Sequence, residues 1–209
     1  VVFGALFGVP CAWILWECVR DPSLFALHPA LNAVAFLLCT PAALCVMLER
    51  KQSKDYKTRV LLTKTHLTLH VIAGLLMAVA GAAAFQTKRM FEKPHFRSVH
   101  SWAALATSSF FLLNILQGLV LTLEKTPRNW QWKDETHVLV GTLVYIGQTV
   151  TIVLGLYTGS WGNDHLGRER QQHLAITILL AHVVLLGKAL IASRPNRSMA
   201  EKLHSGKAT

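Results

Sequence analysis

The sequence KTHLTLH at residues 64–70 lies where a basic segment ends and a run without Asp, Glu, Lys or Arg begins, which continues to Thr87. A histidine at the start of a membrane-length apolar run is costly to bury, so it needs a partner. Three other apolar runs repeat the arrangement, with His28, His100 and His137 close to their starts. The pattern predicts four helices, each with a histidine near its first turn.

Composition indicates an integral membrane protein. Hydrophobic residues make up 52% of the 209 residues and charged residues only 15%, which is too apolar for an ordinary soluble domain. Because a membrane-spanning helix needs about 20 apolar residues, we expect six such helices in one all-α domain covering residues 1–209. The runs without Asp, Glu, Lys or Arg are 1–16, 22–48, 65–87, 98–123, 136–163 and 171–187, and we expect the last helix to continue to about Ala192.

The distribution of charge predicts the orientation. The net charge of +10 could indicate a nucleic-acid partner, but the Lys and Arg residues lie in short blocks between apolar runs, where they orient membrane helices. Fourteen of them follow the second, fourth and sixth helices, against seven after the first, third and fifth. Because the more basic side faces the cytoplasm, we expect both chain ends there, in a multi-pass protein of the lipid bilayer without a nucleic-acid partner.

The histidines form two pairs if neighbouring helices run in opposite directions. In a central four-helix bundle made by the second to fifth helices, His28 then faces His100 on the non-cytoplasmic side, and His66 faces His137 on the cytoplasmic side. The spacings within the pairs are 72 and 71 residues, as hairpins of similar length require. A lone histidine at a helix end is usually a hydrogen-bonded or interfacial residue, but the matched spacing of all four favours ligation.

Two neutral imidazoles from opposing helices are the axial ligands of a six-coordinate b haem. Zinc would need a third or fourth ligand. His66 and His70 are one helical turn apart and could chelate a metal ion, but no acidic residue lies within 65–87 or 136–163 to complete its coordination shell. The sequence therefore predicts two b haems, with the haem iron bound by the four paired histidines.

These residues resemble the cytochrome b561 family of transmembrane ascorbate-dependent oxidoreductases. The motifs that carry the resemblance are Leu27-His28-Pro29, His66 with His70, His100-Ser101-Trp102, and His137 with Gly141. The segment KPHFRSVH at 93–100 is most similar to the single-domain cytochrome b561 domain-containing proteins. The resemblance covers the second to fifth helices, and the first and sixth only by position.

The resemblance implies a bundle with two b haems, ligated by His28, His100, His66 and His137. Electrons would pass from ascorbate on the cytoplasmic side to monodehydroascorbate or ferric iron on the opposite side, a reductase activity of the monodehydroascorbate or ferric-chelate type. His70 matches a second family histidine that is not usually a ligand, so it is a secondary candidate.

The resemblance also implies a cytoplasmic ascorbate site. It would be formed by basic residues just before the third helix, here Arg59 and Lys64, and before the fifth, here Arg128 and Lys133. Ascorbate is a monoanion, so cationic donors beside the haem edge would attract and orient it. The same residues would also be present if they served only to orient the helices.

On the opposite side, Lys93, His95 and Arg97 precede the fourth helix and surround the approach to the His28–His100 site. An imidazole exchanges a proton near neutral pH, so His95 is a candidate proton acceptor for a reacting substrate. The alternative is a solvated loop histidine. His182, in the middle of the sixth helix, is expected to bond to a haem propionate or to a neighbouring helix.

Two other functions are consistent with a histidine-bearing bundle. One is a haem-containing accessory subunit of a larger membrane assembly, and the sequence leaves open both this and a homodimer. The other is a proton or metal transporter with a histidine relay, but such proteins usually carry acidic residues within their helices. Only Glu17, near the end of the first helix, comes close.

Overall fold

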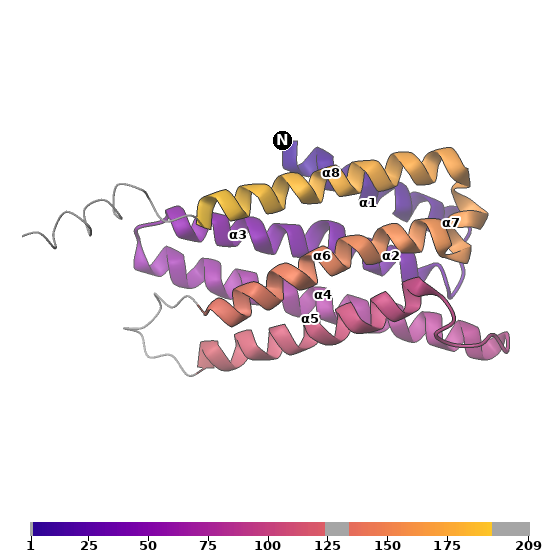
Figure 1. Cartoon of the computed structure of the whole chain (residues 1–209), viewed down its shortest axis with the longest axis horizontal. Helices are drawn as coiled ribbons and strands as arrows, with labels where there is room; N and C mark the ends of the chain where they lie inside the picture. The colour runs from indigo at the N-terminus through magenta and orange to yellow at the C-terminus, as the bar shows by residue number, and fades with distance from the viewer. Residues whose placement is uncertain (1, 124–133, 194–209) are drawn as a thin grey trace, which may run out of the picture.

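The computed structural model describes residues 2–123 and 134–193, and all regular structure within these residues is helical (Figure 1). In chain order the elements are α1 (Val2–Arg20), α2 (Leu27–Ala33), the π-helical stretch η1 (Val34–Cys39), α3 (Thr40–Gln52), α4 (Tyr56–Met90), α5 (Val99–Leu123), α6 (Glu135–Thr158), α7 (Ser160–His165) and α8 (Gly167–Ser193). The prediction of an all-α chain is confirmed for the residues that are described.

Five helical segments among the described residues are long and apolar enough to cross a membrane. They are Leu27–Gln52, which joins α2, η1 and α3, then Tyr56–Met90, Val99–Leu123, Glu135–Thr158 and Gly167–Ala192. They match the second to sixth predicted helices and make the chain an integral membrane protein. The first predicted helix corresponds to α1, which is not among the five, so a sixth span stays a prediction.

The beginning of α4 differs from the expectation that the histidine lies near the first turn. The side chain of Asp55 accepts a hydrogen bond from the backbone N–H of Thr58 at 2.8 Å and so caps a helix that starts at Tyr56. His66 is therefore ten residues inside α4. The prediction is wrong for His66, because the basic segment before it is helical, although it holds for the histidines of α2, α5 and α6.

The end of α6 also differs from the expected run to residue 163. The helix ends at Thr158 because Gly159 takes an extended conformation, with φ −78° and ψ 140°. A Cβ atom at Gly159 would collide with the carbonyl oxygen of Gly155, and one at Gly162 with that of Leu156. Two glycines thus allow the chain to turn tightly from α6 into the short helix α7.

The helices form three neighbouring groups. One pair is α5 with α6, and a second group is α4 with the continuous segment α2, η1 and α3; the two are joined by contacts between α4 and α5. The helices α1 and α8 contact each other and cover α2 and α6. Figure 1 shows α8 and α1 along one side of the molecule, α4 and α5 along the other, and α3 and α6 between them. The elements α2 to α6 therefore form the central bundle that the histidine pattern predicts.

Candidate cofactor sites in the helical bundle

The bundle brings the predicted histidine pairs together at two levels. The ring centroids of His28 and His100 are 6.1 Å apart with an interplanar angle of 87°. Those of His66 and His137 are 6.5 Å apart with an angle of 75°. In each pair the two rings come from different helices and face each other across the bundle.

These separations fit one metal ion between each pair of rings. An imidazole nitrogen binds a metal ion at about 2 Å and lies about 1 Å from its ring centroid, so two axial imidazoles have centroids about 6 Å apart. Among the described residues, no group of three or more His, Cys, Asp or Glu side chains could hold a metal ion by itself. Two nitrogen ligands on opposite sides suit haem iron, whose other four ligands come from the macrocycle.

Hydrogen bonds to the backbone favour one tautomer of the histidines. The Nδ1 atoms of three rings lie 3.0–3.1 Å from carbonyl oxygens of a neighbouring helix, and the fourth ring has a hydrogen bond to the backbone of the facing helix. The partners are Ala80 for His28, Ala43 for His66, Thr151 for His100 and Asn114 for His137. When His28, His66 and His100 donate their Nδ1–H in this way, their Nε2 atoms are unprotonated, which is the form that binds a metal.

Each histidine pair lines a cavity of the size of a small-molecule site. The cavity around His28 and His100, here named cavity 1, has a volume of about 640 Å³, and the cavity around His66 and His137, named cavity 2, has about 340 Å³. The surface inside both cavities is mostly apolar, which suits a haem macrocycle. Among the described residues, cavity 1 has no acidic side chain in its wall, and cavity 2 has only Asp134.

Two glycines make room for the histidine rings of the α5–α6 pair. A Cβ atom at Gly155 of α6 would lie 2.9 Å from Cε1 of His100, and a Cβ atom at Gly118 of α5 would lie 3.1 Å from Cε1 of His137. In both helices the histidine and the glycine are 18 residues apart. The two helices thus present the same pattern in opposite directions, which was not apparent from the sequence alone.

The wall between the cavities contains one polar residue that sequence reasoning missed. Gln148 is buried and lines both cavities. Phe36 of cavity 1 and Phe111 of cavity 2 meet edge to face, with ring centroids 6.2 Å apart. His70 lies in cavity 2, 4.5 Å from the ring of His66 and 5.5 Å from that of Phe111.

Neither of the predicted ascorbate residues that the structure describes lies in the wall of cavity 2. Arg59 and Lys64 lie on α4 and are not among the described residues of its wall, while Arg128 and Lys133 lie outside the described residues. Instead Arg50 and Lys51, at the end of α3, line this cavity. They belong to the basic segment that the sequence singled out, but only packing shows which of its cations face inward.

Of the two residues predicted as candidates near cavity 1, His95 lies in its described wall and Arg97 does not. His95 lines the cavity and stacks on Phe85, with ring centroids 4.4 Å apart. Arg97 is exposed and is not among the described residues of its wall, whereas Lys88 is. The loop that carries His95 has two non-glycine residues with left-handed φ angles, Glu92 at 53° and Phe96 at 52°. Such strain is typical of functional loops.

His182 contacts neighbouring helices and lies apart from both cavity walls. Its Nδ1 is 2.8 Å from the carbonyl oxygen of Ile178, and its ring packs against Phe7 and Tyr145 at centroid distances of 5.0 and 5.1 Å. His182 is buried, and these ring contacts link α8 to α1 and α6. Of the two roles expected for it, the structure shows the contact with neighbouring helices.

A bundle of membrane-spanning helices with two facing histidine pairs is the architecture of a membrane-bound b-type cytochrome. The model of the family described as eukaryotic cytochrome b561 matches residues 27–162, from the start of α2 into α7. The chain belongs to the cytochrome b561 family. Membership implies b-type haem, and the residues of both cavities fit it.

Three curated relatives show the range of similarity. The chain is 24% identical to Probable ascorbate-specific transmembrane electron transporter 1 of Oryza sativa subsp. japonica, over 91% of this chain and 82% of the relative. It is 28% identical to Probable transmembrane reductase CYB561D1 of Homo sapiens, over 78% and 72%. It is 25% identical to Ascorbate-specific transmembrane electron transporter 1 of Zea mays, over 85% and 75%.

Proposed function

We propose that the protein is a transmembrane oxidoreductase with two b haems, one held by His28 and His100 and the other by His66 and His137. The observation that carries the proposal is that the two rings of each pair face each other at centroid distances of 6.1 and 6.5 Å. In each pair, at least one ring places Nδ1 beside a backbone carbonyl, which favours the tautomer with an unprotonated Nε2. Each haem would supply an iron that alternates between the ferric and ferrous states. The printed names of the relatives support electron transport across the membrane.

The direction of transfer follows from the expected orientation. Cavity 2 opens near the strongly basic end of the bundle, which we assign to the cytoplasm, and α1 would be the sixth span that returns both chain ends to that side. Ascorbate would give electrons at cavity 2, and monodehydroascorbate or a ferric chelate would accept them at cavity 1. The names of the plant relatives support ascorbate as a partner.

The cytoplasmic entrance is suited to an anion. Arg50 is buried and donates a hydrogen bond from Nε to the hydroxyl of Thr63 at 2.8 Å, so its guanidinium is held in the wall of cavity 2. Lys51 is exposed at the same wall, and Lys64 and Arg59 lie nearby in sequence on α4. These cations would attract the ascorbate monoanion and orient it at the cavity, together with Arg128.

The opposite entrance is suited to a proton-coupled acceptor. His95 lines cavity 1 without ligating the pair inside it, and Lys88 adds a positive charge to the same wall. The sequence predicts His95 as a candidate proton acceptor. At a site where monodehydroascorbate takes up an electron and a proton to become ascorbate, the same imidazole would instead give the proton that it had accepted from solvent. Lys88 and Arg97 would attract the negative charge of monodehydroascorbate.

The haem content tests the proposal. Pyridine haemochrome analysis of the purified protein should return about two haems per chain, and anaerobic ascorbate should reduce both. A protein that binds no haem, or only zinc, would refute it. One haem per chain would restrict the proposal to one of the two cavities.

A further inference from the structure

The short helix α7 forms part of the wall of cavity 1. Ser160 and Trp161 line this cavity together with His28 and His100. Gly159, which precedes α7, also lines it.

Part of α7 is held by buried contacts, since Trp161 and Leu166 pack in the core and Gln171 of α8 donates a hydrogen bond to Asn163 at 2.9 Å. A polar contact at the exposed end of α7 adds to these.

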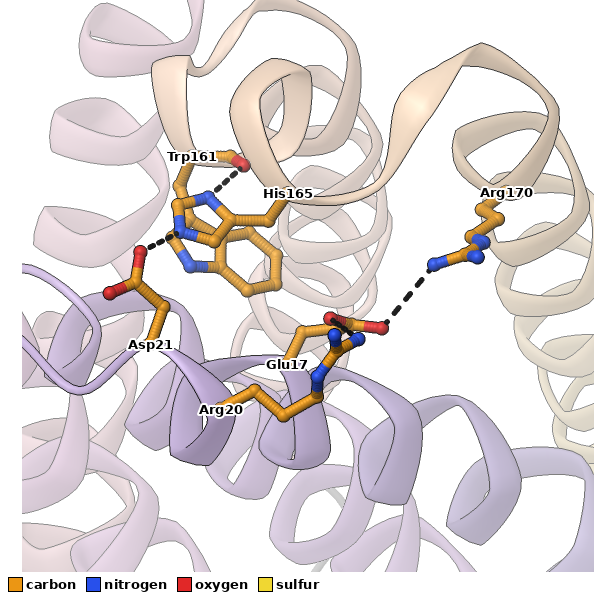
Figure 2. A network of polar contacts seen from close by, with 6 residues as sticks. All are labelled: Glu17, Arg20, Asp21, Trp161, His165 and Arg170. Carbon is orange, nitrogen blue, oxygen red and sulfur yellow. Dashed lines mark hydrogen bonds and ion pairs between the residues drawn. The ribbon is translucent and has the colours of Figure 1, made fainter.

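That contact is made by His165, the last residue of α7 (Figure 2). Its Nδ1 lies 2.9 Å from the carbonyl oxygen of Trp161, and its Nε2 lies 2.9 Å from Oδ2 of Asp21. The imidazole also stacks on the Trp161 indole, with centroids 5.2 Å apart and an interplanar angle of 16°. Asp21 directly follows α1, so His165 ties the wall of cavity 1 to the end of that helix.

The two contacts of His165 require its protonated form. Both ring nitrogens face oxygen atoms that accept hydrogen bonds, one a carbonyl and one a carboxylate. A neutral imidazole has only one N–H group, so it can satisfy one acceptor while its other nitrogen presents a lone pair to the second. The imidazolium ion donates a hydrogen bond to each acceptor, and its positive charge attracts the negative carboxylate of Asp21.

The acidic neighbours of His165 support the same charge state. Burial alone would lower the pKa of His165, but the hydrogen bonds to Asp21 and Trp161 and the charges of Asp21 and Asp164 outweigh it, so the pKa is raised overall. A raised pKa means that the stabilising contact is complete below the ordinary histidine pKa of about 6.5. It is lost as the pH rises through the pKa in the folded protein.

Three other charged groups at this end, Glu17, Arg20 and Arg170, contact one another. The buried Glu17 carboxylate lies 3.3 Å from the guanidinium of Arg20 and 3.6 Å from that of Arg170 (Figure 2). These groups join α1 to the start of α8 whether or not His165 is protonated. They form a permanent contact beside the titratable one, and Arg168 faces the ring of Tyr157 instead.

We infer that Asp21 and His165 are positioning residues that form a pH-sensitive latch, which holds α7 as a wall of cavity 1. Protonation of His165 closes the latch, and loss of that proton weakens the attachment of α7 to α1. The pH on the side of cavity 1 would then control access to this cavity. The inference uses only the chain's own contacts and does not depend on the proposed electron transfer.

Hydrogen–deuterium exchange of the purified full chain tests the latch. The reporters are the amides of Asn163 and Leu166, which donate to the carbonyl oxygens of Gly159 and Gly162 at 3.2 and 3.1 Å. After correction for the intrinsic effect of pH on exchange, their protection should fall by up to about fivefold as His165 deprotonates, as expected for one partly exposed ion pair.

Two variants separate the latch from a general loss of stability. Asp21→Asn should give low protection that no longer changes with pH, whereas the control Asp164→Asn keeps both contacts of His165 and should keep the transition. If Asp21→Asn does not fold, His165→Gln replaces the titratable ring and should also remove the pH dependence. Protection of the unaltered protein that is constant with pH, or a transition that survives either latch variant, would overturn the inference.

Discussion

The carboxylate of Asp134 accepts a hydrogen bond from the backbone N–H of His137 at 2.7 Å, so the residue that caps α6 also fixes the position of a proposed haem ligand. Removal of such a cap costs about 0.5–2 kcal/mol. We expect Asp134→Ala to lower the free energy of unfolding by this amount and to weaken the binding of haem in cavity 2. Asp134→Ser can still cap the helix, so it should lose less of both. Thermal unfolding in detergent and the haem spectrum measure the two effects.

Asp55 provides the matched control. It caps α4 by accepting from Thr58, but it is ten residues or more from any proposed ligand. Asp55→Ala should therefore reduce stability without selective loss of one haem. If both alanine variants gave the same haem spectrum, Asp134 would serve α6 alone and not the position of His137.

The glycines opposite His100 and His137 give a second, site-specific prediction. An added methyl group at Gly155 would press on the ring of His100, and one at Gly118 on the ring of His137. We expect Gly155→Ala to alter the low-spin spectrum of the haem in cavity 1 only, and Gly118→Ala that of the haem in cavity 2 only. Electron paramagnetic resonance resolves the two.

Gly187 is the control for this pair, since a Cβ atom there would meet nothing within 4 Å. Gly187→Ala should leave both haem signals unchanged and, because alanine favours helix, should not reduce stability. Identical spectra of the Gly155→Ala and Gly118→Ala proteins would contradict the assignment of one glycine to each site.

Replacement of the ligands themselves should be equally selective. Substitution of His66 or His137 by alanine should remove the haem of cavity 2 and retain the other, and substitution of His28 or His100 should do the reverse. His70→Ala should perturb the spectrum less than His66→Ala, because His70 lies one turn along the same helix, packs against the ring of His66 at a centroid distance of 4.5 Å and is not a proposed axial ligand. The pairing would be wrong if the His66 and His100 variants had the same residual spectrum.

The membrane spans and the histidine pairs could be predicted because each depends on a property that the sequence displays directly. Apolar runs without charge must be helical in a bilayer, and antiparallel helices bring equally spaced histidines to the same level. The boundaries could not be predicted in this way. The cap at Asp55 extends α4 into a basic segment that reads as a loop, and the conformation of Gly159 stops α6 within an apolar run.

The lining of the cavities depends on which way side chains face, and charge counting does not contain that information. Lys51 and Lys64 both belong to the basic segment before His66, but only Lys51 is in the described wall of cavity 2. The position of Gln148 between the two cavities, and that of Gly155 against His100, are known only when the packing of α5 and α6 is known. The contact of His165 with Asp21 joins residues 144 positions apart, so no local pattern could predict it.

Lys51 and Lys64, both of the basic segment before His66, differ in their position relative to the proposed ascorbate site. Lys51→Ala should slow the reduction of the haem in cavity 2 by ascorbate about twofold to tenfold at low salt, since its charge lies at the cavity wall. Lys64→Ala should slow it less, because Lys64 acts only through long-range attraction. For the unaltered protein the rate should fall as salt shortens the Debye length, which is about 10 Å at 0.1 M.

Stopped-flow reduction measures these rates, and two controls isolate the encounter with ascorbate. Haem content and reduction by dithionite should be the same in both variants, because ligation by His66 and His137 does not involve the lysine side chains. If the ascorbate rate of Lys64→Ala is unaltered and that of Lys51→Ala falls, Lys64 serves only to orient the helices. Unaltered rates in both variants would mean that neither lysine forms part of the ascorbate site. The attraction of ascorbate to this site would then have to come from Arg50, Arg59 or Arg128.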